Sequence, residues 1–230
     1  MKVFVTGGTG FVGQAVVRQL HEAGHAILLL ARNPKAESAQ AIASRYGAEV
    51  HTGNILDAAS LGGALDGAAA VIHLTDIISE VGKSTFEHVH IDGTRNVLAA
   101  AKQAGVRRWV HMSALGTRPH AVSRYHQSKW EAEESVRRSG MEFTIFRPSL
   151  IYGPGDEFVR LFARIIRLSP VVPVMGSPSA RFQPVPVEAV AAAFAGALGE
   201  PKSIGQTYDP KNGGWRSFQF QQRIVIVRDA

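Results

Sequence analysis

Short apolar segments alternate with longer amphipathic segments along the chain as far as Phe146. Each apolar segment is hydrophobic along its whole length, which is typical of strands in a parallel sheet that is covered by helices. The predicted strands are Lys2–Val5, Ala26–Ala31, Glu49–Thr52, Ala70–Leu74, Trp109–Met112 and Phe143–Phe146. The predicted helices are Phe11–Ala23, Lys35–Tyr46, Ala58–Leu65, Ser84–Ala104, Ser128–Ser139 and Phe158–Leu168. This alternation predicts an α/β fold, a doubly wound parallel sheet with helices on both faces.

The pattern changes after Phe146, where prolines become frequent and the regular alternation stops. One further helix is predicted there, over Val187–Leu198. We therefore expect residues 1–150 to form the sheet domain and residues 151–230 to form a small C-terminal cap. Ligands of open α/β sheets bind at the carboxyl ends of the strands, so such a cap would cover the ligand.

The composition adds a few constraints. Apolar residues make up 45% of the 230 residues and charged residues 19%, as in soluble globular proteins. No apolar run approaches the roughly 20 residues that a membrane helix needs. The first predicted strand begins almost at Met1, which leaves no room for a signal peptide, so a cytoplasmic location is expected.

The absence of cysteine excludes disulfides, thiolate nucleophiles and zinc–cysteine sites. The net charge of +6 comes mostly in short pairs, which favours a solvated surface over a nucleic-acid site.

A glycine-rich turn follows the first predicted strand and opens the first predicted helix, as in Rossmann-type folds. Its first glycine, Gly7, permits the tight turn, Gly10 lets the backbone meet phosphate, and Gly13 lets helix and strand pack closely. The free amides and the dipole of the helix start favour an anion. The sequence therefore predicts that this turn binds the pyrophosphate of a nicotinamide cofactor. The predicted contacts are Gly7, Thr9, Gly10, Phe11, Val12 and Gly13.

The end of the second predicted strand bears on the choice of cofactor. A carboxylate there would accept hydrogen bonds from the ribose 2′-hydroxyl of NAD. The segment Leu29–Asn33 offers no carboxylate but contains Arg32, with Lys35 nearby. Because a guanidinium can donate two hydrogen bonds to a 2′-phosphate, NADP(H) is favoured over NAD(H), which stays possible.

Several motifs together resemble the short-chain dehydrogenase/reductase superfamily, in its extended or atypical branch related to NAD-dependent epimerases and dehydratases. Within that branch the chain looks most like bacterial relatives of the thirty-nine-kilodalton accessory subunit of respiratory complex I. The resemblance covers about residues 1–208. It rests on the segments Thr6–Gly13, Gly53–Asp57, Val71–Leu74, Gly93–Leu98, Tyr125–Lys129, Arg147–Asp156 and Phe182–Val185.

The resemblance implies roles for further residues. It places Asn54, Ile55 and Asp57 beside the adenine, and the turn His73-Leu74-Thr75 over the ribose and phosphates of the cofactor. It also implies that Asn96, on the central helix, helps to organise the active site. Pro148 and Ser149 would border the nicotinamide.

The candidate catalytic residues are Tyr125 and Lys129, with Ser113 and, in reserve, Thr117. Tyr125 and Lys129 are four residues apart, so they share one face of a helix. A tyrosine with a pKa near 10 is a poor acid or base at neutral pH, and a nearby ammonium stabilises its phenolate. In the superfamily this pair does the acid–base work, while the lysine also binds the cofactor ribose and a serine or threonine polarises the carbonyl.

Two functions stay open. The first is an NADP(H)-dependent oxidoreductase or epimerase-like enzyme that acts on a small carbonyl, hydroxyl or sugar-like substrate. The second is a non-catalytic NADPH-binding sensor, or an accessory protein of respiratory or quinone-related machinery. From about Asp209 the chain departs from the superfamily pattern. If the cap is shortened, the pocket is either open or completed by a protein partner or a second copy. No metal is expected, because His88 and His90 would point in different directions on a regular helix.

Overall fold

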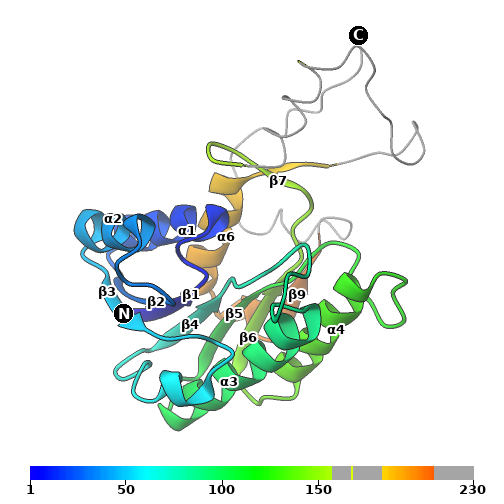
Figure 1. The fold of residues 1–230 in the computed structure, drawn as a ribbon, viewed down its shortest axis with the longest axis horizontal. Helices are drawn as coiled ribbons and strands as arrows, with labels where there is room; N and C mark the ends of the chain where they lie inside the picture. Colours follow the sequence, from blue (N-terminus) through cyan, green and yellow to red (C-terminus); the bar gives the residue numbers. More distant parts are fainter. Residues whose placement is uncertain (157–166, 168–182, 210–230) are drawn as a thin grey trace.

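The computed structural model describes residues 1–156, 167 and 183–209. Its centre is a parallel sheet of seven strands in the order β3-β2-β1-β4-β5-β6-β9 (Figure 1). The strands are β1 (Lys2–Thr6), β2 (Ala26–Ala31), β3 (Glu49–Thr52), β4 (Ala70–His73), β5 (Arg108–Met112), β6 (Glu142–Phe146) and β9 (Gln206–Tyr208). The chain moves outward from β1 to β3 and then crosses to β4 on the other side of β1. This reversal places the topological switch point, where such folds bind ligands, between β1 and β4.

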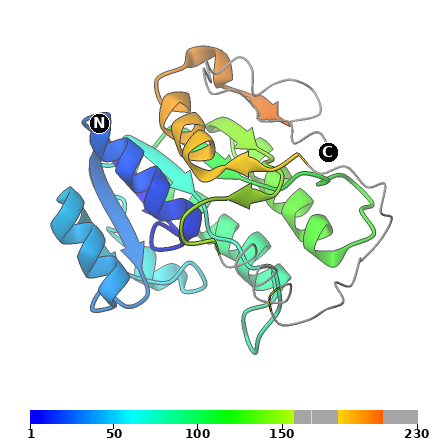
Figure 2. The ribbon, with the colours of Figure 1, turned by 90° about the horizontal axis from the view of Figure 1, so that it is seen from above.

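Helices cover both faces of the sheet. One face carries α1 (Phe11–Glu22), α2 (Glu37–Tyr46) and α6 (Val187–Ala197), and the other carries α3 (Gly93–Gln103) and α4 (Arg124–Arg137) (Figures 1 and 2). Three short helical turns complete the described part: η1 (Ala58–Leu61), η2 (Glu87–Asp92) and η3 (Pro201–Ser203). No helix in the described ranges is long and apolar enough to cross a membrane.

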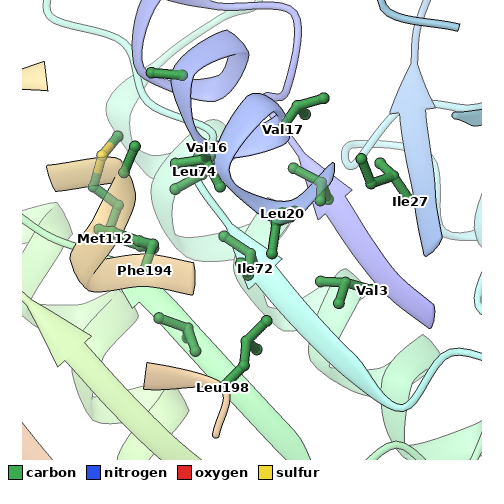
Figure 3. Packing of buried hydrophobic residues seen from close by; sticks show 14 of the residues in the cluster. Val3, Val16, Val17, Leu20, Ile27, Ile72, Leu74, Met112, Phe194 and Leu198 are labelled. Atoms are coloured by element: carbon green, nitrogen blue, oxygen red, sulfur yellow. The ribbon is translucent and has the colours of Figure 1, made fainter. Parts of the chain in front are cut away.

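Each face of the sheet has its own hydrophobic core. On the first face, Val16 and Leu20 of α1 pack with Ile72 of β4 and Phe194 of α6, all fully buried (Figure 3). On the second face, the side chains of Trp109 and its neighbours are covered by α3 and α4. Because both faces are buried, every central strand is apolar along its length, as the sequence pattern indicates.

The predicted strands and helices agree with the structure except at three places. The segment predicted as a helix over Ala58–Leu65 forms only the 3₁₀ turn η1, which ends at Leu61 with Gly62 as its C-cap. The long helix predicted from Ser84 begins as the π-helical turn η2 and continues as α3. Helix α4 begins at Arg124, four residues before the predicted Ser128, because Ser123 is still extended and serves as its N-cap. The predicted helix Phe158–Leu168 lies, except for residue 167, outside the described residues.

The chain after residue 150 contributes to the central sheet. Strand β9 pairs in parallel with β6, and α6 packs against α1. The sequence prediction assigns both segments to a cap, but α6 is too apolar to stand outside the core, since its Val190 and Phe194 are fully buried. Two short strands of the predicted cap do form a separate sheet, β7 (Ile151–Tyr152) and β8 (Val185–Pro186).

Candidate functional site

The turn between β1 and α1 is fixed by two glycines that have no room for a side chain. Gly7 has a φ of +71°, and a Cβ atom on it would lie 2.9 Å from the carbonyl carbon of Leu74. A Cβ atom on Gly13 would lie 2.1 Å from the Gly7 oxygen. Gly7 must be a glycine because the backbone after β4 lies against it. Gly13 must be a glycine because α1 packs closely on the glycine-rich turn itself. The expected roles of these two glycines therefore have a steric cause in the fold.

Gly10 differs because nothing in the fold requires a glycine there. It is exposed, and a Cβ atom on it would meet only the Gly7 oxygen, at 3.3 Å. Gly10 is the N-cap of α1, no side chain caps this helix end, and its first turn contains no acidic residue. The N–H groups at the start of a helix attract anions. The open surface beside Gly10 therefore fits the pyrophosphate of a dinucleotide.

The neighbouring residues of the turn leave this surface open. The side chains of Phe11 and Val12 pack against the first core, so their backbone N–H groups lie at the start of the helix while the side chains point away. The Thr9 carbonyl accepts a hydrogen bond from Gln14 Nε2 at 3.1 Å, which holds the turn against α1.

Arg32 stands directly after β2 and is exposed. No ion pair joins it to another residue of the described part of the chain. The next turn is closed by Asn33, whose Oδ1 accepts the N–H of Lys35 at 3.0 Å. Strand β2 lies beside β1, so the Arg32 guanidinium is available at the same edge of the sheet as the glycine-rich turn.

The predicted adenine side is built from local hydrogen bonds. Asn54 Oδ1 accepts the N–H of Leu56 at 3.1 Å, and Asp57 caps η1. Asn96 Nδ2 donates to the Ile55 carbonyl oxygen at 2.8 Å. Asn96 thus joins the Ile55 turn to α3, so its hydrogen bond lies on the side where the adenine is expected and not beside Tyr125.

The side chains of Tyr125 and Lys129 converge on one carboxylate, that of Asp76. The Tyr125 hydroxyl donates to Asp76 Oδ2 at 3.0 Å. Lys129 Nζ lies 3.3 Å from Asp76 Oδ1 and donates to the Met112 carbonyl oxygen at 3.0 Å. Lys129 is only 1% exposed, so its ammonium depends on these two oxygens in place of water. Helix α4, the end of β5 and the turn after β4 meet at this point.

The side chains of His90, Ser128 and Phe86 complete the cluster. His90 Nε2 lies 2.7 Å from Asp76 Oδ1, and His90 Nδ1 lies 2.8 Å from the hydroxyl oxygen of Ser128. The rings of Phe86 and His90 lie against the Tyr125 ring edge-on, with centroids 5.7 and 5.5 Å away. These contacts fix the direction of the tyrosine ring, because edge-to-face packing is the favoured geometry of aromatic pairs.

The cluster controls the protonation of its members. Burial by itself raises the pKa of Asp76, but Lys129, His90 and the Tyr125 hydroxyl together lower this pKa to about 2. Burial and the charge of Asp76 raise the pKa of Tyr125 far above its ordinary value of 10. Tyr125 in this arrangement keeps its proton at neutral pH and donates a hydrogen bond to the Asp76 carboxylate.

The predicted hydroxyl groups of Ser113 and Thr117 lie in the segment that follows Met112, the last residue of β5. Ser113 is buried, and its hydroxyl donates to Thr117 Oγ1 at 3.3 Å. The Ser113 N–H donates to the Phe146 carbonyl oxygen at 2.7 Å. Close by, the Pro148 carbonyl oxygen accepts the N–H of Leu115 at 2.8 Å, which ties the ends of β5 and β6 together. The structure brings Ser113 and Pro148 to the same edge as Lys129 but records no contact of Ser113 with Tyr125.

The comparison with protein families adds to this geometry. The sequence model of a family described as NAD(P)H-binding matches residues 7–161. This range includes the glycine-rich turn, Arg32, and the cluster around Asp76. The chain belongs to the NAD(P)H-binding family.

Two curated relatives extend the match. The chain is similar to a protein named ceramide reductase from Caulobacter vibrioides, with 35% identity over 191 residues, 83% of this chain and 58% of the relative. It is also similar to subunit 9 of the NADH dehydrogenase (ubiquinone) 1 alpha subcomplex of Arabidopsis thaliana, with 28% identity over 236 residues, 98% of this chain and 56% of the relative. The second match confirms the resemblance to a complex I accessory subunit. The chain spans just over half the length of these curated relatives.

A solved structure confirms the fold. The chain is similar to the NADPH-dependent quinone oxidoreductase QOR2 of Escherichia coli, whose structure contains NADPH. The TM-score is 0.74 and the identity 25%, over 90% of this chain and 68% of the other. The two chains therefore share a fold, in agreement with the match to the NAD(P)H-binding family.

The sequence prediction missed Asp76 and treated His90 only as a metal-ligand candidate. A signal for Asp76 was present, because it follows the turn after β4 and so stands at the carboxyl end of a strand beside the glycine-rich turn. His90 carried no comparable signal. Its direction depends on the π-helical turn η2, and the pattern there predicts a regular helix.

Proposed function

We propose that the chain is an NADP(H)-dependent oxidoreductase that acts on a carbonyl or hydroxyl group. The observation that supports this best is the convergence of Tyr125 and Lys129, from one face of α4, at the carboxyl ends of β4 and β5. The cationic Arg32 at the end of β2, with no acidic residue beside it, supports NADP(H) over NAD(H).

Bound NADPH would supply the hydride that reduces the substrate carbonyl. In this proposal Gly10 and the start of α1 bind the pyrophosphate, and Lys129 binds the ribose of the nicotinamide. Tyr125 then donates its hydroxyl proton to the carbonyl oxygen. Burial and Asp76 raise the pKa of Tyr125 and so oppose this transfer, while the Lys129 ammonium would favour it by stabilising the phenolate that forms. Ser113 polarises the same carbonyl once its hydroxyl turns from Thr117.

The names of the relatives suggest which substrates to test. One is called a ceramide reductase and another a quinone oxidoreductase. We therefore propose a panel that contains a long-chain sphingoid ketone, a short quinone, a simple aromatic ketone and a sugar nucleotide.

The decisive experiment substitutes the proposed proton donor. Tyr125→Phe removes one oxygen atom that contacts Asp76 and leaves the glycine-rich turn intact. We expect turnover on the panel to fall at least 100-fold, since a general acid contributes about that much or more, while the dissociation constant of NADPH changes less than threefold. Consumption of NADPH at 340 nm and a fluorescence titration measure the two quantities. Full turnover by the variant would overturn the proposed role of Tyr125.

The cofactor preference has its own test. Arg32→Ala should weaken NADPH binding at least tenfold, because a charge-assisted contact to phosphate contributes roughly 1.5–3 kcal/mol, and should leave NADH binding within twofold. A fluorescence titration with each nucleotide gives both values. Lys83→Ala is the control, because it removes the charge of an exposed lysine that does not follow β2. Equal losses for NADPH and NADH would show that Arg32 does not read the 2′-phosphate.

A second candidate function is a non-catalytic NADPH-binding protein. The hydrogen bond between Tyr125 and Asp76 favours it, because the tyrosine hydroxyl is engaged within the protein. The similarity to a complex I subunit also supports it. Tight NADPH binding without hydride transfer to any member of the panel would select this function over the first.

A further inference from the structure

Asp76 and His90 are not accounted for by the proposed roles of Tyr125 and Lys129. A single carboxylate contacts the tyrosine hydroxyl at one oxygen, and the lysine ammonium and the imidazole at the other. His90 is 2% exposed and Lys129 1% exposed. A buried ammonium needs a nearby negative charge, so Asp76 is the counter-charge of Lys129.

The groups around His90 can accept hydrogen bonds from a protonated imidazole. Its Nδ1 faces Ser128, and its Nε2 lies between Asp76 Oδ1 and the N–H of Ile77, at 2.7 and 3.2 Å. Burial lowers the pKa of His90, and the hydrogen bond with Asp76 opposes this effect while the charge of Lys129 adds to it. The imidazole is therefore neutral near pH 7 with Lys129 in its present place.

Every titratable group that faces His90 from the surrounding elements is accounted for. Asp76 approaches from the turn after β4, and Lys129 and Tyr125 approach from α4. The two histidines that stack on each other beneath the cluster, His73 of β4 and His111 of β5, are fully buried and have strongly lowered pKa values. Within the described residues, His90 is therefore the group of this cluster that can gain a proton near neutral pH.

We propose that Asp76 and His90 are positioning residues that couple cofactor binding to the uptake of one proton. Asp76 holds Tyr125 as a protonated donor and Lys129 in reach of the ribose. When Lys129 turns to the ribose hydroxyls, Asp76 loses its counter-charge and the repulsion between Lys129 and His90 falls. His90 then takes a proton from solvent and becomes the cation that stays with Asp76. This coupling rests on the proposed function, because it requires that the nicotinamide ribose binds Lys129.

Calorimetric titration of the full chain with NADPH tests the coupling. The binding heat is measured at pH 7 in buffers of different ionisation enthalpy, which gives the number of protons taken up. We expect uptake that approaches one proton in the unchanged chain and falls below 0.2 in His90→Gln. The matched control is His88→Gln, a change two residues away on the same helical turn at an exposed histidine. A repeat with NADH removes the contribution of the 2′-phosphate, which itself titrates near pH 6.

The outcomes separate the coupling from the proposed function. Binding without proton uptake, or uptake that persists in His90→Gln, overturns the coupling and leaves the proposed function standing. Failure of both NADPH and NADH to bind overturns the proposed function and the coupling together.

The positioning role of Asp76 has a test that needs no cofactor. Tyrosinate absorbs at 295 nm, and the difference from a Tyr125→Phe sample isolates the titration of Tyr125. In Asp76→Asn the midpoint should fall by at least one pH unit, because the carboxylate charge is lost while the shape of the side chain is kept. Asp76→Glu, which restores the charge, should return the midpoint upward, and circular dichroism checks that each variant is folded. An unchanged midpoint in Asp76→Asn overturns this role, and so does failure of Asp76→Glu to raise it.

Discussion

At the scale of single residues, Gly13 is required by the packing of the fold, whereas Gly10 is proposed to serve cofactor binding. A methyl group on Gly13 would meet backbone atoms of Gly7 and Gly8 at 2.1 and 2.5 Å. We expect Gly13→Ala to lower the free energy of unfolding by about 2–3 kcal/mol, because backbone cannot move aside as a flexible side chain can. Gly10→Ala should lower it by only about 0.5–1 kcal/mol, because alanine is a poorer N-cap residue than glycine, but should weaken NADPH binding at least tenfold. Urea unfolding and a fluorescence titration measure the two effects, and NADPH binding by Gly10→Ala at full strength would contradict the assignment.

The same contrast explains which site residues could be predicted from the sequence. The glycine-rich turn is local, so its three glycines and the flanking strand and helix stand together in the sequence. The pair Tyr125 and Lys129 is also local, since both lie on one helix. The Asp76 cluster joins three segments that only the fold brings together, and neither Asp76 nor His90 belongs to a repeated pattern.

At the scale of elements, the side chain of Arg108 joins β5 to the last part of the described chain. It is 7% exposed and donates to Thr144 of β6, to the Ala197 carbonyl oxygen at the end of α6, and to Ser203 of η3, at 2.7–2.8 Å. Arg108→Met keeps the apolar length of the side chain but removes the guanidinium hydrogen bonds to these buried groups. We expect a loss of about 3 kcal/mol in the free energy of unfolding.

Thermal or urea unfolding measures this loss, and the neighbouring arginine provides the control. Arg107 pairs with Glu142 at the surface and its side chain is 81% exposed. Arg107→Met should therefore cost less than ~1 kcal/mol. Similar losses in the two variants would show that Arg108 does not hold α6 and η3 to the sheet.

Two elements also show where the pattern of apolar residues stops being informative. Strand β9 has three residues, Gln206–Tyr208, none of them fully buried, so no apolar run marks it. The π-helical turn η2 is wider than a regular helix and changes the direction of the residues on it. The periodicity of the segment predicts one continuous helix, and His90 is therefore placed wrongly when the sequence alone is read.

At the scale of the whole molecule, two histidines in the core make the fold sensitive to acid. Burial lowers the pKa of His73 to about 3, and burial also lowers the pKa of His111 well below 6.5. In the described part of the chain neither ring nitrogen of His111 has a hydrogen-bond partner. The unfolded chain takes up these protons below pH 6.5 and the folded chain does not. The free energy of unfolding should therefore fall as the pH drops from about 6.5 toward 3, by roughly 1.4 kcal/mol per pH unit for each histidine.

Urea unfolding at a series of pH values measures this slope. His111→Phe should make it shallower, because an apolar ring in that place takes up no proton in either state. His21→Phe, a change at an exposed histidine, should leave the slope as it is. Between pH 3.8 and 2 the lowered pKa of Asp76 should add a further loss, as the unfolded carboxyl becomes protonated first. A stability that does not change between pH 6.5 and 4 would contradict the assignment of the two histidines.

The pairing of β6 with β9 has a consequence for how the chain is made. Thr144 finds its partner at Gln206, so roughly 60 residues leave the ribosome between the two strands, which takes on the order of 3–12 s at the usual rates of synthesis. During these seconds the outer edge of β6 has free backbone groups that a strand of another nascent chain can occupy. The exposure ends when the three residues of β9 pair with β6, and the Arg108 hydrogen bonds then hold the neighbouring α6 and η3 to the sheet. A chaperone that covers sheet edges would therefore be needed only until β9 has paired.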